Sequence, residues 1–247
     1  MRKSEYRAKL VCSNYAMKKA LKHLDNYFDN YDDLDDHKYH LDTGLKYCSL
    51  AIKINPQNAY AYLTRGSVYT QKEQFKRAFR DLNKALSLGS NDGDVYYELG
   101  FAHLLCNEFR EAINNFSKAL LVNPERWASW YFRGCAFSDM ELYEKAILDL
   151  KFALSLGTDD KDYDETLSRL NKAYLGRGQQ HLNACRNLEA IDDFTKAASS
   201  KNLIVKAYEG RAAAFTNLGK MEEAKADIAK ANYIREEQEH AKKNSHD

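Results

Sequence analysis

The chain has 247 residues, and its 37 lysines and arginines nearly balance its 36 aspartates and glutamates, which gives a net charge of +1 at neutral pH. A groove built for a phosphate backbone normally carries a large basic excess, so this balance argues against nucleic acid as the partner. No stretch approaches the length of an apolar membrane span, and the basic residues 1–6 lead into no apolar signal sequence. The five cysteines form no CxxC pair and fit reduced thiols, so we expect a cytoplasmic protein.

Residues 1–58 are expected to form a degenerate repeat that caps the chain. A first helix is predicted over residues 5–24, and Cys48, Ala51 and Pro56 fit a second helix. Between them lies an acidic insert, residues 25–36, which contains six aspartates. The insert lacks the glycine and the final glutamate of an EF-hand loop, so we interpret it as a solvated acidic loop and not as a calcium site.

Downstream, the sequence repeats with a period of 34 residues. This spacing separates Gly66, Gly100 and Gly134, and it separates Ala78, Ala112 and Ala146. Such a period is typical of stacked supersecondary units, none of which can bury its apolar face alone. The five repeats occupy residues 59–92, 93–126, 127–160, 171–204 and 205–238, and the places within each repeat are counted from its first residue.

Each repeat is predicted to contain two amphipathic helices. The first carries an aromatic residue at the fourth place of the repeat, a small residue at the eighth and a large ring at the eleventh, as in Tyr62, Gly66 and Tyr69. These offsets lie on one helical face, where a small residue lets another helix approach closely. After a polar break, the second helix carries an alanine, a large apolar residue and a second alanine, as in Ala78, Leu82 and Ala85.

Ten extra residues, 161–170, interrupt the period, because the step from Ala146 to Ala190 is 44 residues. They form either a loop or an N-terminal extension of the next helix. The nearby acidic residues favour the extension, since carboxylates stabilise a helix start: Asp159, Asp160, Asp162 and Asp164. Residues 239–247 form a charged tail that suits a polar C-terminal cap.

The series of aromatic, glycine, aromatic, alanine, aromatic, alanine and proline resembles the tetratricopeptide repeat family. Repeat 93–126 has the fullest set: Tyr96, Gly100, Ala112, Phe116, Ala119 and Pro124. The resemblance implies an all-α, right-handed solenoid of stacked antiparallel helix pairs. It also implies a scaffold or adaptor that recognises a partner protein, with no catalytic residue and no cofactor.

An arginine and an aspartate covary between the repeats. Four repeats carry Arg at the seventh place and Asp at the twenty-third, whereas repeat 93–126 changes both, to Leu99 and Asn115. These places lie opposite each other in an antiparallel helix pair, so we predict structural ion pairs Arg65–Asp81, Arg133–Asp149, Arg177–Asp193 and Arg211–Asp227. The alternative is casual pairing in solvent, worth about 0–1 kcal/mol each.

Two His/Cys pairs have the spacing of metal ligands on a helix, His103 with Cys106 and His181 with Cys185. Both histidines occupy the place that other repeats fill with a packing aromatic. We therefore interpret them as packing residues and predict no metal site. No Ser/His/Asp constellation or Gly-rich phosphate loop is present in the sequence.

The resemblance implies that places two, five, nine and twelve of the first helices face a concave groove. The residues predicted there are Tyr60, Leu63, Tyr97, Phe101, Leu104, Tyr131, Lys172, Leu175 and Gln179. We expect an extended segment or amphipathic helix of a partner to bind the aromatic residues. Four alternatives stay open: these rings pack between repeats, the chain self-associates, the two His/Cys pairs serve an enzyme or bind a metal, or the repeats bind RNA.

Overall fold

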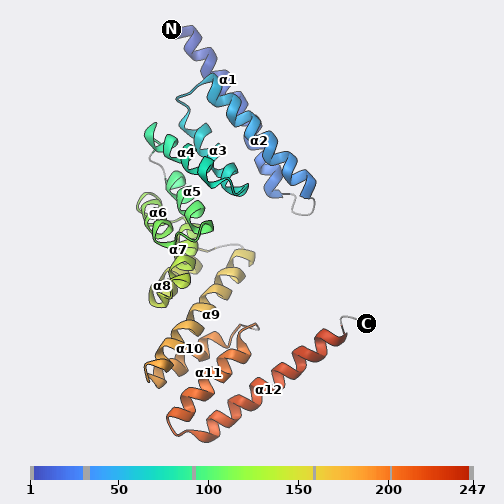
Figure 1. Cartoon of the computed structure of the whole chain (residues 1–247), viewed down its shortest axis with the longest axis vertical. Helices are drawn as coiled ribbons and strands as arrows, with labels where there is room; N and C mark the ends of the chain where they lie inside the picture. Colours follow the sequence, from blue (N-terminus) through green and yellow to red (C-terminus); the bar gives the residue numbers. More distant parts are fainter. Residues whose placement is uncertain (1–2, 30–33, 91–92, 158–159, 201, 245–247) are drawn as a thin grey trace. The chain divides into compact units, whose positions relative to one another are not determined.

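The computed structural model describes residues 3–29, 34–90, 93–157, 160–200 and 202–244. All regular secondary structure in these ranges is α-helical, which confirms the prediction of an all-α fold (Figure 1). The chain forms two compact units, residues 1–124 and 125–247. In the described part of the chain, no helix has the length and apolar character that crossing a lipid bilayer requires.

The described residues of the N-terminal unit form three helix pairs. They are α1 (Lys3–Asp29) with α2 (Leu34–Ile54), α3 (Ala59–Gln71) with α4 (Phe75–Ser87), and α5 (Gly93–Leu105) with α6 (Phe109–Val122). Residues 25–29 and 34–36, which we expected in an acidic loop, belong instead to α1 and α2, because these helices pair over more turns than a repeat helix does. Residues 30–33 of that loop lie outside the described residues.

Three pairs are also formed by the part of the C-terminal unit that the structure describes. They are α7 (Trp127–Asp139) with α8 (Tyr143–Ser155), α9 (Asp160–Asn183) with α10 (Asn187–Ala197), and α11 (Ile204–Asn217) with α12 (Met221–Asn244). Residues 161–170 extend α9 at its N-terminus, where Asp160 and Asp162 lie in the first turn. Residues 239–244, expected in a charged tail, continue α12.

Helices within a repeat touch where the pattern places small residues. Ala112, between the helices of repeat 93–126, is 0% exposed. The ring of Phe116 is also 0% exposed and lies against Gly100, so close that a Cβ on this glycine would be 2.8 Å from the ring. Leu82, Leu150 and Phe194 lie against Gly66, Gly134 and Gly178 in the same way. Alternating large and small residues therefore allow the two helices of a repeat to pack closely.

The turn between the two helices has the same geometry in every repeat. The residue at place fifteen is left-handed, with φ of 55° at Glu73, 59° at Asn107 and Glu141, 58° at Cys185 and 74° at Gly219. The next amide donates to the carbonyl five residues earlier at 2.8–2.9 Å, as from Gln74 to Tyr69. This pattern ends each first helix at the same place and fixes the register of the pair.

Candidate functional site

The four arginines of the covarying pairs lie against their aspartates. Each donates from Nε to Oδ2 at 2.6–2.9 Å and from Nη2 to Oδ1 at 2.8–3.0 Å, in the pairs Arg65–Asp81, Arg133–Asp149, Arg177–Asp193 and Arg211–Asp227. The aspartates are only 1–6% exposed. Both helices of a repeat are joined by this bidentate contact, so the guanidinium is not available to a ligand.

In three of these arginines the third nitrogen, Nη1, contacts the preceding helix pair. Nη1 of Arg65 donates to Ser49 Oγ in α2 at 3.2 Å, and Nη1 of Arg211 donates to Thr195 Oγ1 in α10 at 2.9 Å. Nη1 of Arg177 donates to Glu144 Oε2 of α8 at 2.5 Å. One side chain thus stabilises a repeat internally and fixes it to the preceding helix pair.

The predicted groove residues of the N-terminal unit differ in exposure. Tyr60 is 49% exposed, while Tyr97, Phe101 and Leu104 are half-buried. The rings of Tyr97 and Phe101 lie parallel with centroids 6.3 Å apart. Leu63 is a correction, because it is 5% exposed and packs in a core with Leu82, Ala85, Val95 and Leu99, where no partner can reach it.

Tyr131 is the second correction to the predicted groove. It is 4% exposed, and its hydroxyl donates to Glu165 Oε1 at 2.6 Å. It packs in a core with Cys135, its neighbour on α7, and with Leu170 of α9. Burial raises the pKa of Tyr131 above the usual tyrosine range. The N-terminal extension of α9 therefore covers the groove places of the third repeat. The position of this extension could not be predicted from the repeat period, because the inserted residues lie outside it.

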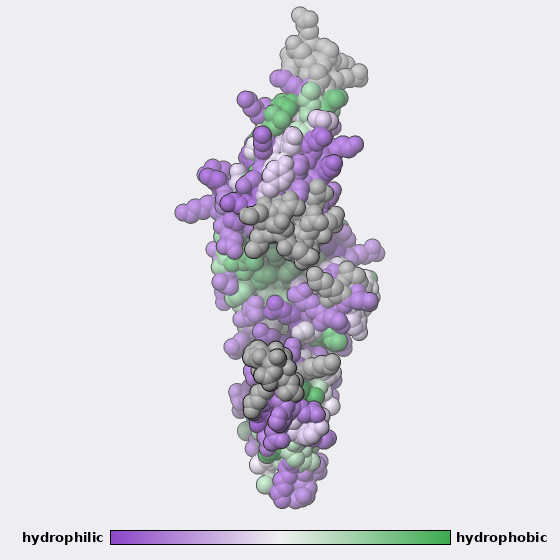
Figure 2. Space-filling view, turned by 90° about the vertical axis from the view of Figure 1, so that its right-hand side faces the viewer, coloured by the Kyte–Doolittle hydropathy of each residue, from purple (hydrophilic) through white to green (hydrophobic). Residues whose placement is uncertain are grey.

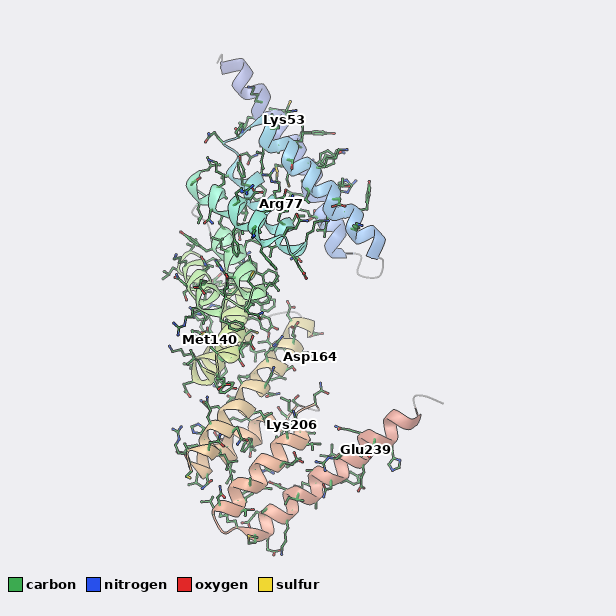
Figure 3. The ribbon with its side chains drawn as sticks, in the orientation of Figure 1. Lys53, Arg77, Met140, Asp164, Lys206 and Glu239 are labelled. Atoms are coloured by element: carbon green, nitrogen blue, oxygen red, sulfur yellow. The ribbon has the colours of Figure 1, made fainter. Side chains whose placement is uncertain are left out.

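An open groove lies in the C-terminal unit between the end of α7, the start of α8, α9 and α11, with a volume of about 920 Å³. The structure brings together three predicted residues here, Lys172, Leu175 and Gln179. Figure 3 labels Lys206 of α11, which lines the same groove. Sequence reasoning missed the residues contributed by the last position of α7, the α7–α8 turn and the start of α8: Asp139, Glu141 and Tyr143. In the sequence, only their position beside the predicted turn between the two helices of the repeat could have indicated that they line the groove.

Two glycines allow large rings to form the bottom of the groove. A Cβ at Gly176 would be 2.4 Å from the ring of Tyr143, and one at Gly210 would be 2.6 Å from the ring of Phe194. Any larger side chain at either glycine would displace a ring. The groove therefore has a smooth centre, with Leu175 beside it and polar side chains at its margins.

Hydrogen bonds fix part of the polar margin. Gln180 Nε2 donates to the carbonyl oxygen of Glu141 at 3.1 Å, which ties α9 to the α7–α8 turn. Gln179 Nε2 donates to Asn183 Oδ1 at 2.8 Å, one turn further along α9. Burial, and after it the charges of Glu141 and Asp139, raise the pKa of Tyr143.

The histidines of the two His/Cys pairs contact side chains other than the cysteines. His103 Nδ1 is 2.6 Å from Glu108 Oε2, and its ring centroid is 4.5 Å from that of Phe79. His181 Nε2 is 3.5 Å from Asp193 Oδ2. Across the ranges that the structure describes, no group of three or more His, Cys, Asp and Glu side chains is arranged to hold a metal ion.

A model of the tetratricopeptide repeat matches residues 59–92, 93–126 and 205–238, with the bounds of three predicted repeats. The chain contains tetratricopeptide repeats. It is 26% identical over 108 residues to serine/threonine-protein phosphatase 5 of Rattus norvegicus, which is 43% of this chain and 22% of the phosphatase. It is 31% identical over 67 residues to the human mitochondrial import receptor subunit TOM70, which is 27% of this chain and 11% of TOM70. The chain thus matches less than a quarter of the length of either relative.

Solved structures share the fold of this chain. YrrB, described as having an unusual peptide-binding site, superposes with a TM-score of 0.57 at 23% identity, over 79% of this chain and 97% of YrrB. Pseudomonas aeruginosa pilF superposes with a TM-score of 0.58 at 14% identity, over 91% of this chain and 90% of pilF. At these identities the similarity establishes the architecture alone.

Proposed function

We propose that the chain is a non-catalytic scaffold whose C-terminal unit binds a segment of a partner protein in the groove between α7, α9 and α11. Tetratricopeptide repeats are protein-binding modules. The observation that carries the proposal is the open groove of about 920 Å³, which combines an apolar centre with charged and amide margins. A peptide-binding site is also described for YrrB, which shares the fold.

The location of the groove follows from the α9 extension. It covers the groove places of the third repeat, so the open part begins at the end of α7 and continues across α9 to α11. Figure 2 shows one face of the molecule, on which apolar residues form patches among hydrophilic side chains. Tyr97 and Phe101 form a second, smaller aromatic surface on α5, which we propose as a further contact for the same or another partner.

Affinity capture with a variant that fills the groove tests this proposal. Ala213 is exposed and lines the groove, so Ala213→Arg introduces a long charged side chain without removing a packing contact. Ala229→Arg, at an exposed position on α12 away from the groove, is the matched control. We expect wild type and the α12 variant to capture the same protein from a lysate of the source organism, and the groove variant to lose it.

Three other outcomes would contradict the proposed groove or its proposed partner. Equal capture by all three proteins would place the binding site outside this groove. No capture, together with a mass that rises with concentration in sedimentation, would favour self-association. Capture of RNA with a steep dependence on salt would favour nucleic acid binding.

A further inference from the structure

We propose that the groove of the C-terminal unit takes an amphipathic helix whose apolar stripe has acidic side chains along one flank and basic side chains along the other. This inference rests on the proposed function, because it specifies the segment that the same groove binds. The main evidence for this inference is that the two rims of the groove have opposite charges.

One rim is basic. Lys172 of α9 and Lys206 of α11 occupy the second place of successive repeats, and both line the groove with exposed side chains. Neither lysine makes an ion pair with another described residue. Glu209, one turn after Lys206, is already paired with Arg235 of α12. The positive charge of this rim is therefore available to a ligand.

The opposite rim is acidic. Asp139 ends α7 and Glu141 lies in the following turn, and both are exposed groove residues. No ion pair joins either carboxylate to the part of the chain that the structure describes. Asn183 ends α9 at the same rim, so the C-terminal ends of two helices add partial negative charge. The raised pKa of Tyr143, due first to burial and then to these carboxylates, agrees with a negative potential here.

The distance between the rims favours a helix as the occupant. Lys172 and Asn183 are eleven residues apart on α9, which corresponds to about 16 Å along the helix axis. A helix with its side chains is about 10–12 Å across, so long charged side chains on its flanks reach both rims. An extended strand directs alternate side chains to opposite faces, so it could reach both rims only with a backbone edge against the groove floor, where Leu175 and Leu182 offer no polar partner.

The centre of the groove suits the apolar stripe of such a helix. Leu175 and Leu182 from α9 and Ala213 from α11 line it. At Gly176 and Gly210 the missing side chains make room for the rings of Tyr143 and Phe194, which close the bottom of the groove beneath the stripe. Burial of the stripe would supply affinity, and the charged rims would select the partner and its orientation.

Selection from a displayed library of helical peptides tests the proposal. Stripe positions would carry Leu, Ile, Met, Phe or Ala, and flank positions Glu, Lys, Gln or Ser. The targets are the wild type, a Lys172→Glu/Lys206→Glu variant, and a Lys145→Glu/Lys151→Glu control on exposed positions of α8, which changes the net charge equally outside the groove. Peptides that also bind Ala213→Arg are discarded, and circular dichroism checks the helicity of every target.

We expect wild type and control to enrich peptides with Glu on one flank and Lys on the other, and the Lys172/Lys206 variant to enrich Lys on both flanks. A wild-type-selected peptide should bind that variant about tenfold more weakly, which is about 1.4 kcal/mol. Proline in the middle of this peptide should abolish binding.

Two results would overturn the inference alone. Enriched peptides without a preference at the flanks, or with the same preference on the charge-reversed variant, would contradict the polarity and leave the groove as a binding site. Equal binding of the proline-containing peptide would show that the occupant is extended. Failure to enrich any groove-dependent peptide would contradict the proposed function as well.

Discussion

Removing one partner of the Arg65–Asp81 pair should destabilise the protein far more than replacing both. The side chain of Asp81 is 5% exposed, and its carboxylate accepts two hydrogen bonds, at 2.6 and 3.0 Å, from Arg65, whose side chain is 19% exposed. Arg65→Leu leaves this buried carboxylate without a counter-charge. Breaking a buried pair in this way costs about 3–5 kcal/mol.

Repeat 93–126 shows how the same positions pack without charge. Leu99 replaces the arginine and is 5% exposed, and Asn115 replaces the aspartate and donates to the carbonyl of Glu111 at 2.9 Å. Arg65→Leu/Asp81→Asn copies this solution into the first repeat. The double variant should lose only about 1 kcal/mol, so Asp81→Asn should restore about 2–4 kcal/mol of the stability that Arg65→Leu removes.

Urea unfolding followed by circular dichroism measures the free energy of unfolding of wild type, both single variants and the double variant. The reasoning is refuted if the double variant is no more stable than Arg65→Leu. It is also refuted if Arg65→Leu costs less than about 1 kcal/mol, the value of a casual surface pair.

Three further predictions concern packing, thiol reactivity and pH. Phe116→Ala should cost about 3–5 kcal/mol in the same urea assay, and a loss below about 1 kcal/mol would contradict its burial against Gly100. Burial raises the pKa of Cys48 to about 12 and that of Cys135 to about 11, so these two thiols should not react with maleimide in the folded protein. Mass spectrometry after maleimide treatment should find both unmodified and should find the label on the exposed Cys12 and Cys185. Burial, and after it the charge of the neighbouring His40, lower the pKa of His23 from 6.5, so the unfolded chain binds a proton more readily than the folded chain. The melting temperature should therefore fall as pH drops below 6.5. His23→Gln should weaken this dependence on pH, and an unchanged dependence would contradict the prediction.

The sequence by itself determined the helix pairs and the contacts inside them. A helix has a fixed period, so the spacing of Gly100 and Phe116 specifies which residues of two adjacent helices meet. The same reasoning placed Arg65 opposite Asp81, because the turn between the two helices has one geometry in every repeat. These features are local, and they recur in each repeat, so comparing the repeats was enough to find them.

Only the tertiary structure decided which predicted groove residues are open to a partner. Periodicity gives the face of a helix on which a side chain lies, but whether that face is covered depends on a neighbouring helix. Leu63 is enclosed by the adjoining repeat, and Tyr131 is covered by the α9 extension through Glu165. The extension lies outside the repeat period, so its direction depends on packing against α7, and that packing leaves the open groove between α7, α9 and α11.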